Sequence, residues 1–141
     1  MVRMSAPFVW RTRIRFIDTD ASQRIHYTAL FKHFEAAEEE FLRSFGQSFT
    51  SWETGNLGFP RVHVECDISG ALAYGDEIDV QVAVDRVGNS SYTLLFLVFK
   101  AAAEVARGRI VVVCMNRDTQ KSHPLPPGFG DSLRARLASA G

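Results

Sequence analysis

The sequence contains few of the features that cross-link a chain or bind a metal. It has only two cysteines, Cys66 and Cys114, and each stands in an apolar, strand-like run. We therefore expect two buried, reduced thiols, which are typical of a cytoplasmic protein, rather than a disulfide framework. The histidine nearest to Cys66 in sequence is His63, and that spacing matches no zinc motif. The sequence thus predicts neither a disulfide nor a metal site.

Charge of one sign and long apolar runs are also missing. Lys and Arg total 16, as do Asp and Glu, so the net charge is zero and no strong field favours nucleic acid or an anionic membrane. No apolar run approaches the length of a membrane span, and residues 1–16 lack the continuous apolar core of a signal peptide. A G-x-S-x-G motif is absent, so serine hydrolase chemistry has no support. We expect no nucleic-acid or membrane partner.

What is present is an ordinary globular composition over 141 residues, with 46% hydrophobic residues. That length predicts a single domain, residues 1–141, with a substantial core. Eleven phenylalanines indicate a core or a pocket with much aromatic surface.

The first half of the chain predicts a strand, a polar turn and one long helix. Residues 9–17 alternate between polar and apolar side chains, and residues 18–25 are polar. A helix should begin near Tyr27 or Thr28 and end at Gly46. Its apolar face carries Leu30, Phe31, Phe34, Ala37, Phe41, Leu42 and Phe45, and its polar side carries Lys32, His33, Glu35, Glu38, Glu39, Glu40 and Arg43.

The second half predicts four strands with short connections. They fall within residues 61–68, 77–87, 90–102 and 107–118, with a turn signal at Gly88 and Asn89. Residues 131–141 predict a short terminal helix. One helix against a largely antiparallel sheet is an α+β arrangement. Such a sheet needs a cover on its other side, so we expect it to meet another subunit.

Two acids, Asp18 and Asp20, stand just before the helix start. The first N–H groups of a helix lack internal partners and lie at the positive end of its dipole, where they stabilise an oxyanion. A carboxylate beside them can activate water or attack a carbonyl carbon directly. This pattern suits hydrolysis of an ester or thioester. The alternative is that both acids only cap the turn.

Two stretches of the chain carry a family resemblance. "DTDASQRIHYTALFKHFEAAEEEFLRSFG" and "ALAYGDEIDVQVAVDRVGNSSYTLLFLVF" resemble the 4-hydroxybenzoyl-CoA thioesterase branch of the hot-dog superfamily, which includes the YbgC-like acyl-CoA thioesterases. The resemblance implies a hot-dog fold, in which an antiparallel sheet wraps a long helix. It also implies a homodimer or homotetramer whose active sites lie at the dimer interface.

The resemblance implies roles for particular residues. Asp20 matches the catalytic carboxylate of this branch, and Tyr27 matches the residue whose backbone N–H polarises the thioester carbonyl. Ser22 and Gln23 replace the usual pair of glycines, and the common Tyr-His order is reversed here as His26 and Tyr27. A sister subclass has a catalytic Glu eight residues after the oxyanion amide, which corresponds to Glu35. Asp18 is expected to act locally, on backbone N–H groups or a nearby arginine.

Further residues are candidates for substrate binding, although each also has an ordinary structural explanation. They are His26, His63, Asn89, Ser90 and Ser91, with Arg86, Arg117 and Lys121 as candidates for the CoA phosphates. The sequence therefore predicts an acyl-CoA thioesterase that needs no cofactor, since CoA is part of its substrate. The alternatives are a hot-dog hydratase or dehydratase using His26 or His33 with Glu35, and a non-catalytic acyl-CoA-binding module.

Overall fold

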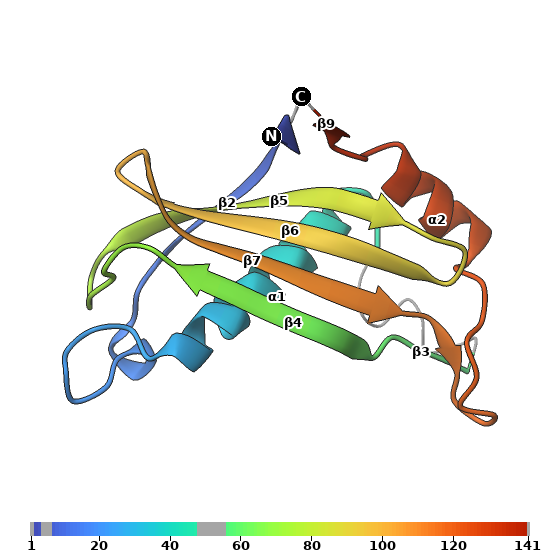
Figure 1. Ribbon diagram of the computed structural model, residues 1–141, viewed down its shortest axis with the longest axis horizontal. Coiled ribbons are helices and arrows are strands. Elements are labelled where there is room, and N and C mark those ends of the chain that lie inside the picture. Colours follow the sequence, from blue (N-terminus) through green and yellow to red (C-terminus); the bar gives the residue numbers. More distant parts are fainter. Residues whose placement is uncertain (1, 4–6, 48–55, 141) are drawn as a thin grey trace.

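The structure is a computed structural model that describes residues 2–3, 7–47 and 56–140 (Figure 1). One long helix, α1 (Tyr27–Arg43), lies across one face of a five-stranded antiparallel sheet whose strand order is β2-β5-β6-β7-β4. The strands are β2 (Phe8–Arg13), β4 (Arg61–Ile68), β5 (Glu77–Val87), β6 (Ser91–Lys100) and β7 (Ala103–Val113).

Short elements complete the chain around this layer pair. Two pairs of two-residue strands join segments that are distant in sequence: β1 (Val2–Arg3) with β9 (Ser139–Ala140), and β3 (Leu57–Gly58) with β8 (Met115–Asn116). A 3₁₀ turn, η1 (Phe16–Asp18), precedes α1, and helix α2 (Pro127–Arg134) packs near the end of β5. None of the described helices is long and apolar enough to cross a membrane.

The core forms where α1 meets alternate residues of the sheet. Leu94, Phe96 and Val98 of β6 point to the helix and are completely buried. Phe34 of α1 stacks on Phe96 with ring centroids 4.7 Å apart. A Cβ at Gly108 of β7 would overlap the ring of Phe34, so the helix can approach the sheet this closely only because residue 108 has no side chain.

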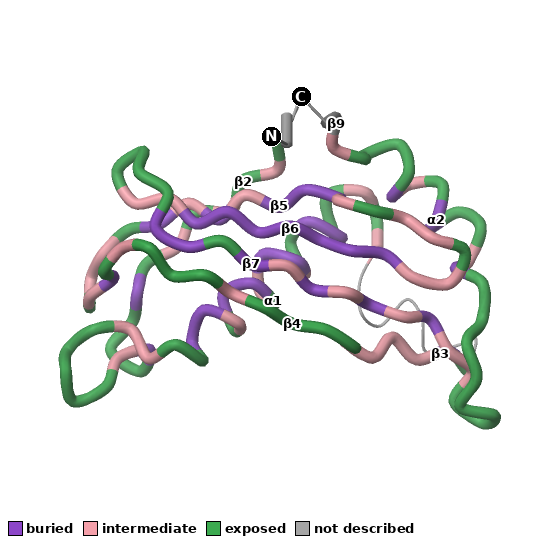
Figure 2. The backbone as a smooth tube through the Cα atoms, viewed as in Figure 1, coloured by how far each residue is buried: buried purple, intermediate pink, exposed green. Residues whose placement is uncertain are grey.

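The edge strand β4 is more exposed to solvent than the inner strands of the sheet. Figure 2 shows β6 largely buried, whereas β4 is exposed along most of its length. Val62, Val64 and Ile68 of β4 are 60%, 50% and 48% exposed. An eight-residue edge with exposed β-branched side chains is an open template for pairing with another strand.

The predicted α+β arrangement is confirmed, and the differences lie at element ends. The helix begins at Tyr27 as expected, but the first strand ends at Arg13 rather than near Ile17, because residues 16–18 turn into η1. The last helix spans Pro127–Arg134 instead of residues 131–141, since a proline is well placed in a first helical turn. Cys114 is buried as predicted, but Cys66 is only half-buried, and both thiols are free.

Candidate active site

The loop between η1 and α1 closes on itself and presents Asp20 to solvent. At its base the carbonyl oxygen of Asp18 accepts a hydrogen bond from the His26 amide at 2.7 Å. Farther out, the Asp20 amide donates to the Arg24 carbonyl at 3.1 Å. The loop is also fixed to the sheet side, because the Ile25 amide donates to the Leu72 carbonyl at 2.8 Å. A short, closed loop therefore holds Asp20 beside the start of α1.

The carboxylate of Asp20 is exposed and ionised at neutral pH. Its Oδ1 accepts hydrogen bonds from the Ser22 hydroxyl at 2.5 Å and from the Ser22 amide at 2.8 Å. These bonds, the hydroxyl first, lower the pKa of Asp20 below its ordinary value. Within the described part of the chain no donor contacts Oδ2. One oxygen is thus held by Ser22 while the other is open to a water or a substrate.

The first turn of α1 leaves one backbone donor free. His26 is the N-cap residue, and its Nδ1 accepts a hydrogen bond from the Thr28 amide at 3.3 Å. The Ala29 amide donates to the His26 carbonyl at 2.9 Å. The Tyr27 amide has no acceptor among the described residues. It therefore stands at the positive end of the helix dipole, where it can donate to a carbonyl oxygen or an oxyanion.

Asp18 is buried and serves the loop and the helix. Its Oδ2 accepts hydrogen bonds from the Arg15 amide at 2.8 Å and from His33 Nε2 at 3.0 Å. The expected bond from a backbone N–H is confirmed, but the side-chain partner is His33 and not an arginine. His33 is only 8% exposed. Its placement on the polar side of the helix was therefore wrong.

The other sequence candidates do not gather around Asp20. Glu35 is an exposed helix residue. His63 is exposed on β4, and its Nε2 lies 2.8 Å from Glu65 Oε1. Asn89 and Ser90 form the turn between β5 and β6, and Ser91 begins β6.

That β5–β6 turn lies at the opposite end of the sheet from Asp20. The loop that carries Asp20 is paired with the segment before β5, through the Arg24–Ala73 bridge and the Ile25–Leu72 hydrogen bond, whereas Asn89–Ser91 follow the last residue of β5. A strand of ten residues, such as β6, spans about 33 Å. Within one chain, the two groups of predicted site residues are therefore too far apart to bind the same carbonyl group. Arg86, Arg117 and Lys121 are exposed and lie toward the β5–β6 turn.

A buried acid at the middle of α1 was missed by the sequence analysis. Glu38 is 1% exposed, and its Oε2 lies 2.8 Å from Arg61 Nη2 and 3.3 Å from the Tyr92 hydroxyl. Burial raises the pKa of Glu38, although the charge of Arg61 opposes the shift. The prediction placed Glu38 on the polar side of the helix, which was wrong. Its spacing from Phe34 and Phe41, four and three residues, puts it on the apolar stripe.

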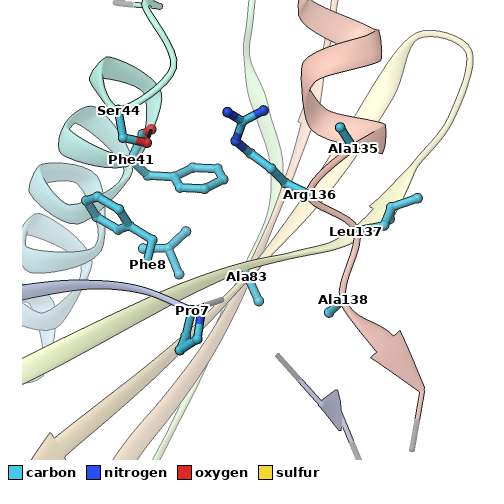
Figure 3. Close-up of a pocket in the computed structure, with 10 residues that line it drawn as sticks. Pro7, Phe8, Phe41, Ser44, Ala83, Ala135, Arg136, Leu137 and Ala138 are labelled. Carbon is cyan, nitrogen blue, oxygen red and sulfur yellow. Dashed lines mark hydrogen bonds between the residues drawn. The ribbon is translucent and has the colours of Figure 1, made fainter. Parts of the chain in front are cut away.

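A cavity of about 310 Å³ lies near the other end of α1 (Figure 3). Phe8 and Phe41 form one wall, and the segment that follows α2, with Arg136, forms the other. The guanidinium of Arg136 lies 4.1 Å from the ring centroid of Phe45. Phe41 is fourteen residues beyond Tyr27, which is about 21 Å along a helix. This cavity is therefore separate from the Asp20 loop.

Groups of His, Cys, Asp and Glu that could hold a metal ion do not occur among residues 2–3, 7–47 and 56–140. The loop itself offers the carboxylate of Asp20 and the backbone N–H group of Tyr27.

A family model described as "Thioesterase-like superfamily" matches residues 12–133. The chain belongs to the thioesterase-like superfamily. A curated protein of Aquifex aeolicus is 31% identical over 101 residues, which are 72% of this chain and 79% of that protein. A 1,4-dihydroxy-2-naphthoyl-CoA hydrolase of Synechococcus sp. (strain CC9605) is 28% identical over 138 residues and 93% of either chain.

The structural comparison agrees with the family. The crystal structure of a 1,4-dihydroxy-2-naphthoyl-CoA thioesterase from Synechocystis is similar with a TM-score of 0.86 and 20% identity, over 92% of this chain and 96% of that one. The hot-dog fold and the enzyme class, a thioesterase, are thereby confirmed. The individual site residues, the oligomeric state and a cytoplasmic location stay predictions.

Proposed function

We propose that this thioesterase hydrolyses the thioester of an acyl- or aroyl-CoA to the free acid and CoA, with the Asp20 carboxylate as base or nucleophile and the Tyr27 amide as the oxyanion donor. The observation that carries the proposal is their pairing on one loop. An ionised, exposed carboxylate and an unpaired helix amide stand at the two sides of a loop closed by the Asp18–His26 bond. Thioester hydrolysis needs both groups.

The reaction has two possible courses at Asp20. As a base, Asp20 takes a proton from water while the water oxygen attacks the carbonyl carbon. As a nucleophile, its open Oδ2 attacks the carbonyl carbon and forms an anhydride, which water then hydrolyses. In both courses the Tyr27 N–H donates to the oxyanion of the tetrahedral intermediate. Collapse of this intermediate breaks the C–S bond, which in the second course precedes hydrolysis of the anhydride. The CoA sulfur leaves with the electron pair and takes a proton, from the Asp20 carboxyl in the first course and from water in the second.

The names of similar proteins support a proposal for the substrate class. Two of the similar proteins named above act on 1,4-dihydroxy-2-naphthoyl-CoA by name, and a further similar structure is that of a gentisyl-coenzyme A thioesterase. These acyl groups are aromatic. We therefore place aroyl-CoA esters first among the substrates, with short- and medium-chain acyl-CoA esters as the alternatives. No cofactor is part of the proposal.

The site is proposed to be shared between two subunits. The Asp20 loop and the Asn89–Ser91 turn lie at opposite ends of one sheet. A second copy paired antiparallel along the exposed β4 edge would bring its own Asn89–Ser91 end to the Asp20 end of the first. This arrangement gives a homodimer with a continuous sheet, or a homotetramer built from two such dimers. His63 and the exposed Val64 would then lie at the interface.

Lysine substitutions on the two edge strands, β4 and β2, test the proposed β4 interface. Val64→Lys should convert the oligomer to a monomer, because edge lysines oppose strand pairing. Val9→Lys is the matched control, since Val9 is 45% exposed on the other edge strand, β2. Sedimentation equilibrium reads the result. A wild-type monomer that is active at micromolar concentration would overturn the shared site.

Thiol release from a panel of acyl-CoA esters tests the activity itself. We expect turnover of at least one aroyl- or acyl-CoA with release of free CoA. Hydration of an enoyl-CoA without thiol release would favour a hydratase. Tight acyl-CoA binding without turnover would favour a binding module. Neither alternative is favoured by an observation in the structure.

A further inference from the structure

A buried contact ties the Asp20 loop to the second turn of α1. Asp18 and His33 are each 8% exposed, and Asp18 Oδ2 lies 3.0 Å from His33 Nε2. Oδ2 already accepts a hydrogen bond from the Arg15 amide, so we take it as the acceptor and His33 Nε2 as the donor. The ring of His33 also contacts Trp10 of β2, with centroids 6.3 Å apart. The pair thus joins the loop, the helix and the sheet.

The position of Asp18 gives this contact its importance. Asp18 is two residues before Asp20, and its carbonyl oxygen accepts the amide hydrogen of His26, the residue before Tyr27. One residue therefore fixes both branches of the loop. Its carboxylate, held by the Arg15 amide and by His33, anchors that residue to the helix. A shift of Asp18 would move the carboxylate of Asp20 and the Tyr27 amide relative to each other.

We propose that Asp18 and His33 are positioning residues that hold the Asp20 carboxylate and the Tyr27 amide in register. This inference rests on the proposed thioesterase site, because it assigns the pair to the same two groups. Both residues are buried, so we assign them a positioning role and not a catalytic one. Positioning errors of about 1 Å in a catalytic group can cost a hundredfold in rate.

His33→Phe is the informative substitution, because it keeps an aromatic ring beside Trp10 and removes the donor to Asp18. The matched control is Tyr92→Phe, which removes a donor to another buried carboxylate, Glu38, away from the loop. Both variants should lower the unfolding midpoint. Only His33→Phe should lower kcat, by at least about tenfold, with KM changed less than about threefold. His33→Gln, which restores an N–H donor, should recover most of kcat.

Amide hydrogen exchange provides a readout that does not depend on activity. The amides of Asp20 and His26 are hydrogen-bonded within the loop. They should exchange at least about tenfold faster in His33→Phe and remain at the wild-type rate in Tyr92→Phe. Equal kcat and equal exchange in the two variants would overturn the positioning role. Absence of thiol release by the wild-type protein would overturn the proposed function instead, while the exchange result would still decide the inference.

Discussion

Two carboxylates at helix α1 lie in opposite environments. In the loop just before the helix, Asp20 is exposed, and hydrogen bonds from Ser22 lower its pKa. At its middle, Glu38 is enclosed by Arg61 and Tyr92, and burial raises its pKa. A buried acid with a raised pKa is a common mark of an active site. Here Glu38 is 1% exposed, whereas Asp20 is exposed in the loop that precedes the Tyr27 amide, which has no acceptor among the described residues. We therefore place the proposed site at Asp20, on its exposure and its neighbouring donor rather than on the direction of the pKa shift.

The largest expected effect is the loss of turnover when the charge of Asp20 is removed. Asp20→Asn keeps the size of the side chain and removes its charge. Turnover should fall by at least about a hundredfold, because the variant has no base or nucleophile. The unfolding midpoint should change little, since Asp20 is exposed. Steady-state thiol release measures the rate, and Glu35→Gln is the control. Normal turnover in Asp20→Asn with loss in Glu35→Gln would move the catalytic acid onto the helix.

The next effect comes from removing the ion-pair partner of Glu38, and it should change the free energy of unfolding but not the turnover. Arg61→Met removes the cation from a carboxylate that is 1% exposed. Leaving a buried charge unpaired costs about 3–5 kcal/mol, and we expect about 2 kcal/mol here because the Arg61 side chain is 28% exposed. Urea denaturation measures the free energy of unfolding. Retention of full stability would show that Glu38 is protonated or reached by water.

A smaller effect concerns how stability depends on pH. The unfolded chain releases the Glu38 proton near the ordinary glutamate pKa of about 4.3, whereas the folded chain holds it to higher pH. Between these two pKa values the folded state binds more protons, so the free energy of unfolding falls as pH rises. Glu38→Gln should remove this fall, and exposed Glu40→Gln should keep it. Parallel pH curves for Glu38→Gln and the wild type would contradict the assignment.

The smallest effect sharpens the Asp20 environment. Ser22→Ala removes the hydroxyl bond that contributes most to the lowered pKa of Asp20. The pKa of Asp20 should rise, so the acidic limb of kcat/KM should move to higher pH while the rate at pH 7 changes little. Ser22→Thr keeps the hydroxyl and serves as the control. An unchanged acidic limb in Ser22→Ala would show that Asp20 does not set it.

The sequence predicts the elements of this fold better than their burial. Periodicity identifies α1 and the four strands from β4 to β7, because alternation and helical spacing reflect the faces that pack. It fails for Phe16 and Ile17, which read as strand but are 79% and 87% exposed in η1. A local hydrogen bond, from the Arg15 amide to Asp18, overrides the apolar pattern there.

The candidate site shows a similar limit. Asp20 and Tyr27 come from a contiguous motif, so the resemblance can indicate them. His33 and Glu38 were assigned to the polar side by residue type, although their spacing places them on the apolar stripe. Their burial depends on partners far away in sequence or across the helix, Asp18 and Arg61. The pairing of the Asp20 loop with the segment before β5, which puts Asp20 and Asn89 at opposite ends of that strand, is likewise a tertiary feature.

Because Gly108 has no side chain, α1 packs closely against the sheet at this point, and the ring of Phe34 fills the space above Gly108. The Tyr27 amide lies seven residues away, about 10 Å along the helix. A side chain at residue 108 would push α1 away from the sheet and change its tilt, and the Tyr27 amide would move with the helix. The alignment of the reactive groups therefore depends on a strand residue that touches neither of them. Substitutions at residue 108 of β7 could therefore adjust this alignment while the sequence of the Asp20 loop stays unchanged.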